Sequence, residues 1–374
     1  MTSANHNKPN RTGLQRVCSG PFLLAVGFIG VLLLRLFYCF QVPWHTTDLL
    51  RNLGYGREFW RLGFAVYNYT PQDFAPHPCQ FLWGGHYYTY PAFAVFFFAL
   101  IAPLSPGLIA AKLWLTLFDV VNTVLIKKTT NDRLLAFLYF VNPIGIWHVS
   151  HEGQFESVVS FWMILAIFLL RRGSPWSFCA LGAAIQTKLF PVFLIPTFFL
   201  TVSRTAFKDW GRSIGFFALS FLPSLMVITQ SEYLSRFFNP GYVPTLNHIS
   251  WEIMDYSHFQ YQPWWLIIIN AVASTGILIL IVWLCYKDKA ILNYLPSFLF
   301  IFFLKSSPLA QFWYLQLFPA FALTVKHPGH RRLLFLACMA LGTRSILSIL
   351  GVQFAYMNPP DIVELLRSCL WSIP

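Results

Sequence analysis

The chain has 374 residues, of which 56% are hydrophobic and 11% are charged, and its net charge at pH 7 is +12. Soluble domains carry roughly a quarter charged residues, so the composition excludes an ordinary soluble protein and indicates a polytopic membrane protein. Much of the positive charge lies in short basic clusters between apolar runs, as membrane topology requires. The charge therefore does not indicate a nucleic-acid partner.

The chain starts with a basic segment, residues 1–20, followed by an apolar run at 21–40. No small-residue cleavage site follows this run, which predicts an uncleaved signal-anchor with its N-terminus in the cytoplasm. We expect residues 21–351 to form a single transmembrane domain that contains a large extracytoplasmic loop at 41–90. Residues 352–374 are expected to form an extracytoplasmic tail.

Further apolar runs predict the other membrane spans. They lie at 107–126, 134–148, 158–170, 176–187, 189–202, 214–229, 264–285, 291–304, 312–325 and 333–351. Several are shorter than the roughly 20 residues that cross a bilayer, so they cross only inside a bundle that shields their ends. The run at 90–103 is shorter still, and we interpret it as a juxtamembrane or re-entrant helix. If this run is not counted as a membrane span, the later basic clusters fall on the cytoplasmic side. The sequence then predicts an all-α bundle of about eleven transmembrane helices.

The candidate functional residues gather on the extracytoplasmic side, and the first of them is Asp48. Asp48, Arg51, Asn52, Tyr55 and Phe59 share a face at helical spacing. This pattern predicts a helix in the membrane interface with its polar side toward water. Asp48 would then be a general base at the membrane surface, and Arg51 an anion contact. The alternative is a surface ion pair of little energetic value.

Two lysines lie at the outer ends of predicted spans, against the usual placement of positive charge. A cation at that depth is costly unless it is paired or faces water, so Lys188 and Lys305 are candidates for binding a phosphate. Each could instead be a snorkelling lysine that anchors a helix end. Their shared side with Asp48 favours the phosphate site.

Residues 142–157 form the densest polar patch, with His151, Glu152, Gln154 and Glu156 as candidates for hydrogen bonds to a substrate. Such a His/Glu/Glu set could bind a divalent metal. Metal sites usually have more carboxylates, so we do not favour this interpretation. Two polar residues within a predicted span, Asp119 and Asn122, are expected to form hydrogen bonds between helices.

Aromatic residues add to the outer surface around His86, where Tyr87, Tyr88 and Tyr90 follow. Aromatic faces commonly bind sugars, although an aromatic belt at the interface is the ordinary explanation.

On these residues the chain resembles the GT-C superfamily of membrane glycosyltransferases, which use lipid-phosphate sugars as donors. The superfamily carries an Asp in its first extracytoplasmic loop, and Asp48 matches it. Residues 47–91 look like the first loop of mannosyltransferases that use polyprenyl or dolichyl phosphate mannose. Residues 142–157, with Gly153-Gln154-Phe155-Glu156-Ser157, are similar to the second loop of the first GPI mannosyltransferase and of the N-glycan glucosyltransferases. The turn Lys188-Leu189-Phe190-Pro191 and Lys305 with Gln311-Phe312-Trp313-Tyr314 also stand at family-like positions.

The resemblance implies a GT-C-like bundle of about eleven transmembrane helices, with interfacial helices in the first extracytoplasmic loop. It also implies an inverting glycosyltransferase that moves a hexose, mannose above all, from a polyprenyl- or dolichyl-phosphate donor to a lipid-linked or glycan acceptor. Asp48 would be the catalytic base, and Arg51, Lys188 and Lys305 would bind the donor phosphate. The substrate would be contacted by Tyr55, His86, His151, Glu152, Gln154, Glu156, Gln311 and Tyr314.

No cofactor is expected from the resemblance, and a divalent metal is not favoured. Thr46 stands where relatives with an Asp-x-Asp pair have their first carboxylate. The host membrane would be a bacterial plasma membrane or the endoplasmic reticulum, with the site on the non-cytoplasmic side.

Two other functions compete with this interpretation. A secondary transporter or lipid-linked-sugar flippase should have charges near the midplane and often two related halves. Only Arg35 and Asp119 fit the first expectation, and no internal repeat is evident. A non-catalytic membrane subunit would tolerate the loss of Asp48.

Overall fold

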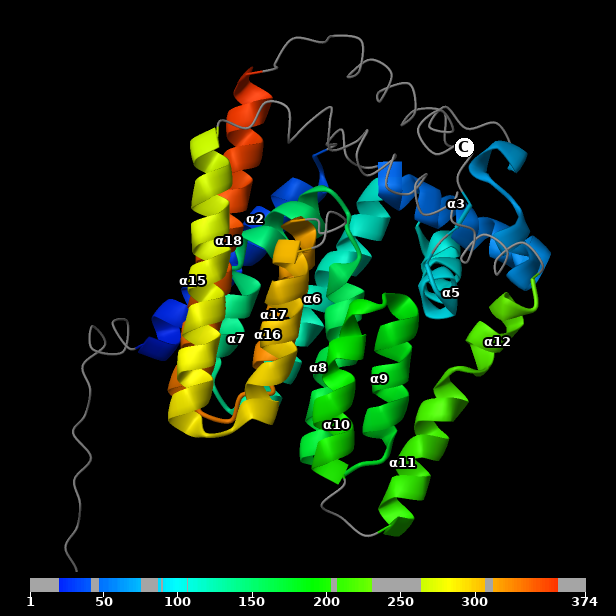
Figure 1. Cartoon of the computed structure of the whole chain (residues 1–374). Helices are drawn as coiled ribbons and strands as arrows, with labels where there is room; N and C mark the ends of the chain where they lie inside the picture. The colour runs from blue at the N-terminus through cyan, green and yellow to red at the C-terminus, as the bar shows by residue number, and fades with distance from the viewer. Residues whose placement is uncertain are drawn as a thin grey trace, which may run out of the picture.

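The structure, a computed structural model, describes residues 20–41, 47–74, 87–88, 90–105, 107–202, 207–230, 264–306 and 312–355. In these ranges every regular element is a helix and none is a strand (Figure 1). The expected all-α fold class is thus confirmed for the described part of the chain. Leu, Ile, Phe and Ala dominate the helices, and Pro or Gly residues stand at many of their starts.

The elements are as follows in chain order. They are α2 (Gly20–Cys39), α3 (Thr47–Leu62), η2 (Gly63–Asn68), η3 (Pro71–Asp73), α5 (Ala92–Ile101), η4 (Ala102–Leu104), α6 (Leu108–Thr130), α7 (Arg133–Phe140), the π-helical turn η5 (Gly145–His151), α8 (Glu156–Arg171), α9 (Trp176–Thr187), η6 (Phe190–Leu194), α10 (Ile195–Val202), α11 (Phe207–Ser220), α12 (Leu222–Ile228), α15 (Trp264–Asp288), α16 (Ile291–Ser306), η7 (Phe312–Leu317), α17 (Phe318–Ala322) and α18 (Pro328–Ala355).

Two of the described helices, Phe22–Cys39 and Leu108–Thr130, are long and apolar enough to cross a membrane. The number rises to four if two bent helix pairs, Gly145–His151 with Glu156–Arg171 and Trp210–Ser220 with Leu222–Ile228, each form one span. Other helices are shorter than the roughly 20 residues of a perpendicular crossing, such as α9 with 12 residues. Membrane helices are therefore present, while the count of about eleven stays a prediction.

Helix α3 lies across the upper end of the bundle and packs on α5 (Figure 1). The two backbones approach closely at Gly56, where an added Cβ would stand 2.4 Å from the carbonyl of Phe98. Helix α5 has 10 residues and rises about 15 Å, which is half of a hydrocarbon core. This length agrees with a helix that does not cross the membrane.

The helix predicted at Asp48 is present, but the prediction that its polar face points toward water is wrong. Asn52 and Tyr55 of that face are 2% and 0% exposed. On the opposite face Leu49 and Leu53 are buried as well, and Trp60 is exposed. The rings of Phe74 and Tyr88, from the loop that follows α3, pack on the ring of Tyr55. Helical spacing identified the two faces, but it did not show that the loop folds back over the polar one.

A buried ion pair between Arg35 and Asp119 joins α2 to α6. Arg35 Nη1 lies 2.9 Å from Asp119 Oδ2, and both side chains are inaccessible to solvent. The pair also bonds to groups of three further elements, α7, η5 and η7: the carbonyls of Phe140 and Gly145, Ser150 Oγ, Tyr139 OH and Gln316 Nε2. Asn122 donates to Tyr139 OH and to the Ser157 carbonyl. The expected helix–helix hydrogen bonds of Asp119 and Asn122 are confirmed.

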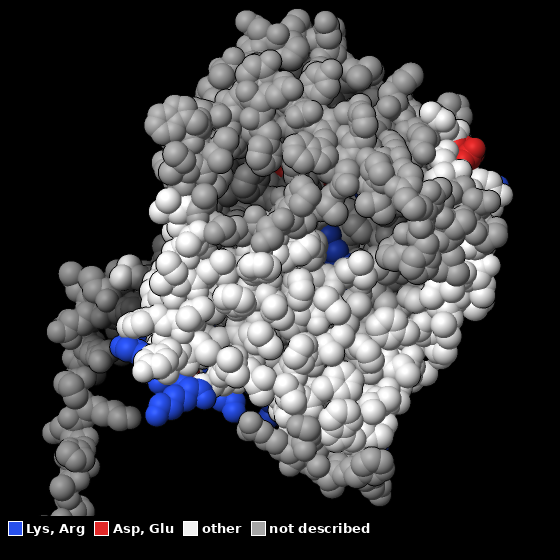
Figure 2. Space-filling model, in the orientation of Figure 1, with Lys and Arg blue, Asp and Glu red and all other residues white. Residues whose placement is uncertain are grey.

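Basic side chains occupy the end of the bundle that lies opposite the first turn of α8. Arg171, in the last turn of α8, donates to the carbonyls of Thr129 and Leu323. Arg332 binds Asp132, the N-cap residue of α7. Figure 2 shows Lys and Arg side chains gathered along the lower edge of this face, below a surface that is mostly uncharged. Arg171 and Arg332 therefore lie together at this end, and the membrane side of the basic clusters stays a prediction.

Candidate active site

Asp48 stands in the first turn of α3, where a carboxylate also complements the positive end of the helix dipole. Its Oδ1 lies 3.1 Å from Arg51 Nη2, and its Oδ2 lies 3.4 Å from Gln154 Nε2. The Asp48 side chain is 19% exposed and that of Arg51 is 8% exposed. The pair is thus largely enclosed, which does not fit the alternative of a solvated surface ion pair.

Tyr90 is the aromatic residue on which the cations of the site converge. The guanidinium carbon of Arg51 lies 5.6 Å from the centre of the Tyr90 ring. Burial lowers the pKa of Arg51, but the Asp48 carboxylate and the tyrosine hydroxyls around it outweigh burial and leave this pKa raised. Burial and the Asp48 carboxylate raise the pKa of Tyr90. At neutral pH the site therefore combines a permanent cation with a protonated phenol.

Lys188 forms a second buried ion pair, with Glu156. Lys188 is the C-cap residue of α9, and Glu156 stands in the first turn of α8. Lys188 Nζ contacts Glu156 Oε1, and it lies 4.4 Å from the ring centre of Tyr314, 4.9 Å from that of Phe155 and 5.6 Å from that of Tyr90. A snorkelling lysine holds its ammonium in water, whereas this ammonium is enclosed by aromatic faces and a carboxylate.

The two ion pairs belong to one site because Tyr90 lies against both cations. A turn at Gly153 brings the pairs together. Gly153 has φ +80°, and a Cβ there would stand 2.5 Å from Leu49 Cδ2. The turn after η5 therefore needs a glycine at position 153, because only glycine readily adopts this φ and leaves room for Leu49 of α3. After this turn the Gln154 side chain donates to Asp48, and α8 begins at Glu156, which contacts Lys188.

Two other predicted residues, His151 and Glu152, lie on a different side of the same segment. Glu152 accepts from Trp147 Nε1 at 2.9 Å, and its other oxygen lies 2.5 Å from His148 Nδ1. The ring of His151 packs against Trp147 and against Tyr38 of α2. The structure therefore divides the polar patch between a group facing Asp48 and a group facing α2.

The remaining predicted residues have varied positions. Tyr55 is buried, and its hydroxyl donates to the Tyr69 carbonyl at 2.9 Å. Tyr314 lies in η7 and contacts Lys188. Lys305 lies in α16, but its side chain is outside the described part, as are His86 and Gln311 altogether. Their roles in substrate binding stay predictions.

Sequence reasoning assigned no role to two buried residues, Phe155 beside Lys188 and Lys112 beside the end of α2. Lys112 is a buried cation within a span, a signal that could have been noticed. It donates to the carbonyls of Cys39 and Gln41, at the end of α2. No such signal marks Phe155, one Phe among 39.

No three His, Cys, Asp or Glu side chains within the described ranges lie close enough together to hold a metal ion. The two carboxylates of the site, Asp48 and Glu156, each have a cationic side chain as a partner. Chemistry without a metal stays a prediction.

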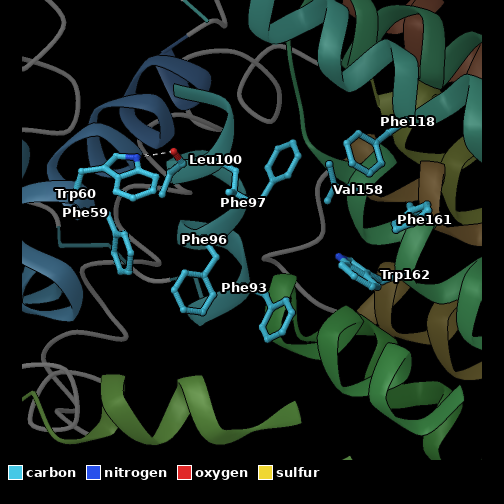
Figure 3. A pocket seen from close by; sticks show the side chains of 11 residues that line it. Phe59, Trp60, Phe93, Phe96, Phe97, Leu100, Phe118, Val158, Phe161 and Trp162 are labelled. Atoms are coloured by element: carbon cyan, nitrogen blue, oxygen red, sulfur yellow. Dashed lines mark hydrogen bonds between the residues drawn. The ribbon is translucent and has the colours of Figure 1, made fainter. Parts of the chain in front are cut away.

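The structure also contains an open apolar groove of about 470 Å³ (Figure 3). Helices α3, α5, α6 and α8 line it with Phe59, Trp60, Phe93, Phe96, Phe97, Ala99, Leu100, Phe118, Val158, Phe161 and Trp162. Helices α3 and α8, which carry Asp48 and Glu156, therefore also line the groove. Val158 follows Glu156 by two positions on α8, and side chains at that spacing do not face each other. Trp60, at the other side, donates from Nε1 to the Ala99 carbonyl at 2.7 Å.

Comparison with known proteins adds one match. A family model described as glycosyltransferase family 87 matches residues 88–310, which is more than half of the chain. No curated protein and no solved structure matches. The matched range contains Tyr90, Glu156 and Lys188, whereas Asp48 and Arg51 precede it.

Proposed function

The chain belongs to glycosyltransferase family 87, and from this premise we propose that it is an inverting hexosyltransferase with a polyprenyl- or dolichyl-phosphate sugar as its donor. One observation carries the proposal. The Asp48–Arg51 pair and the buried Lys188 meet at Tyr90, whose ring centre lies 5.6 Å from both cations, and helices α3 and α8 of this site also line an apolar groove. A base, a phosphate contact and a place for a lipid tail are the three parts that such a donor requires.

In the proposed reaction Asp48 takes the proton of an acceptor hydroxyl. The acceptor oxygen attacks the anomeric carbon on the face opposite the phosphate and forms the new C–O bond. The bond between the anomeric carbon and the phosphate oxygen breaks, and its electron pair leaves with the lipid phosphate. Lys188 and Arg51 stabilise the charge that develops on this phosphate, and we extend this role to Lys305.

The aromatic groove supports a lipid-linked donor. Its lining is almost wholly apolar, and the exposed Trp60 and Leu100 leave it accessible from the side. Each buried methylene of a prenyl tail contributes about 0.8 kcal/mol of transfer free energy. In the proposed complex the tail occupies this groove and the phosphate contacts Lys188.

Further parts of the proposal rest on the sequence. The sugar is mannose, the acceptor is a lipid-linked or glycan hydroxyl, and Gln154, which bonds Asp48, contacts the substrates. The protein crosses a bacterial plasma membrane or the endoplasmic reticulum membrane several times, with residues 1–20 in the cytoplasm. The site lies on the non-cytoplasmic side, within the single domain 21–351, and 352–374 form a tail on that side.

The arrangement of Arg35 and Asp119 gives little support to a transporter. Both charges are buried, each neutralises the other, and both bond to backbone or side-chain groups of neighbouring helices. A transport site needs midplane charges that exchange partners with a substrate or an ion. This pair instead has the contacts of a structural ion pair.

A transfer assay tests the proposed function. Wild type in liposomes should consume radiolabelled polyprenyl-phosphate mannose or glucose, and Asp48→Asn should lower the rate by about 10²- to 10⁴-fold. Glu58→Gln is the matched control, because Glu58 lies on the same helix but pairs with the exposed Arg61. A fully active Asp48→Asn variant would remove the proposed base. If wild type consumes no prenyl-phosphate sugar, the choice of donor is wrong.

A further inference from the structure

Glu156 has an arrangement that phosphate binding alone does not explain. Its side chain is 0% exposed, and Lys188 contacts only one of its oxygens. The other oxygen, Oε2, is buried without a hydrogen-bond partner among the described residues. A buried carboxylate oxygen without a donor is strongly disfavoured. Glu156 therefore presents an acceptor that a hydroxyl of a bound ligand can satisfy.

The charges of the cluster sum to zero, which is unusual for a site that holds an anion. Arg51 and Lys188 supply two positive charges, and Asp48 and Glu156 supply two negative ones. Without Glu156 the cluster would be cationic and would bind any phosphate more tightly. The carboxylate is thus placed where it weakens the attraction of Lys188 for anions.

The donor and the product of the proposed reaction differ in charge. A prenyl-phosphate sugar is a phosphodiester with one negative charge, and the prenyl phosphate left after transfer is a monoester with a charge of about −1.5 to −2 at pH 7. The donor also has sugar hydroxyls that can donate to Glu156 Oε2, and the product has none. Repulsion by Glu156 therefore acts more strongly on the product, which also lacks the compensating hydrogen bond.

We propose that Glu156 makes the site select the sugar-bearing phosphodiester over the bare prenyl monophosphate, and so favours release of the product. This inference rests on the proposed donor class. Glu156 forms no bond to the reacting atoms in this role and is a specificity residue. Its neighbours in the site are Lys188 at the end of α9, Tyr314 from η7 and Tyr90 before α5, and the charges of Asp48 and Arg51 from α3 act on the same two tyrosines.

Equilibrium binding to the purified full-length protein tests the inference, with a short radiolabelled prenyl monophosphate and the corresponding prenyl-phosphate mannose as probes. Wild type should prefer the mannose compound. Glu156→Gln should tighten binding of the monophosphate by about tenfold or more and change binding of the mannose compound much less. Glu58→Gln should bind both probes as wild type does. Equal changes for both probes in Glu156→Gln would overturn the inference.

A second measurement needs no variant. Below the second pKa of the monoester, about 6, both probes carry one charge, so the preference of wild type should shrink at pH 5. An unchanged preference at pH 5 would overturn the charge argument. If both probes bind wild type equally at pH 7, only the inference fails. If neither binds at all, the proposed donor class fails first and the inference fails with it.

Discussion

At the scale of single residues, the contact between Lys188 and Glu156 is the one whose loss should be most informative. Lys188→Met leaves the Glu156 carboxylate buried without a counter-charge, which should lower the free energy of unfolding by about 3–5 kcal/mol. Lys188→Met combined with Glu156→Gln should restore most of this stability, because no buried charge is then unpaired. Neither variant should transfer sugar. Thermal unfolding in detergent, measured beside the transfer rate, separates the two effects.

A Lys188→Met variant as stable as wild type would show that the pair is not a buried ion pair. Recovery of transfer in the double variant would show that Lys188 does not bind the phosphate. The stability of Lys188→Met tests the buried ion pair, and the transfer rate of the double variant tests phosphate binding by Lys188.

The sequence pointed to Asp48, Arg51, Lys188 and Glu156 as site residues, but it did not show that Lys188 pairs with Glu156. Asp48, Lys188 and Glu156 were each recognised as a polar residue in an unusual place. Lys188 and Glu156 are 32 positions apart, and no spacing rule connects such residues. Tyr90 was noted only as part of an aromatic surface, because a tyrosine near an interface has a more common explanation.

At the scale of elements, the start of α3 depends on the turn at Gly153. Gly153→Ala should strain a backbone with φ +80° and force Leu49 aside, at a cost of about 1–2 kcal/mol from the backbone alone. Since Leu49 adjoins Asp48, the transfer rate should fall more than the stability does. Comparison of the rate per folded molecule with the unfolding midpoint tests this.

The matched control is Gly54→Ala. Gly54 lies on α3 itself, and an added Cβ there meets no atom within 4 Å. Alanine should leave transfer unchanged and stabilise the helix by about 0.4–1 kcal/mol. If Gly153→Ala behaves like Gly54→Ala, the turn does not position Asp48.

Helical periodicity predicted α3 and the short helix α5 with nearly the right bounds. It could not show which surfaces the first loop covers. Asn52 and Tyr55 are polar residues, so their sequence pattern predicts exposure, although both are buried. The π-helical turn η5 has no periodic signal of its own. Contacts with other parts of the chain accompany it: Arg35 donates to the carbonyl of Gly145, its first residue, and Gln154, three positions after its end, donates to Asp48.

At the scale of the whole molecule, the ion pair of Arg35 and Asp119 joins α2 and α6 and bonds to three more elements. Asp119→Asn should destabilise the protein by about 3–5 kcal/mol, yet transfer per folded molecule should stay at the wild-type level. A variant that folds normally but is inactive would instead assign the pair to the function, as a transporter would require. Folding yield and specific activity, measured on the same preparation, decide between these results.

Composition and apolar runs predicted the all-helical fold of the described residues and the presence of membrane helices. The number of membrane spans could not be predicted with the same certainty from the sequence. Several apolar segments are shorter than a full span and cross the membrane only if neighbouring helices shield their ends. Helix α9 is such a segment, since Lys188 at its end is stable there only through Glu156 and the surrounding rings.

The most direct test of the account is a cryo-electron microscopy structure with a non-transferable phosphonate analogue of polyprenyl-phosphate mannose. The account predicts the phosphonate against Lys188 Nζ, the anomeric carbon facing Asp48, and the prenyl chain in the groove between α3, α5 and α8. A phosphonate bound away from Lys188, or an anomeric carbon that no acceptor oxygen could reach from Asp48, would contradict it.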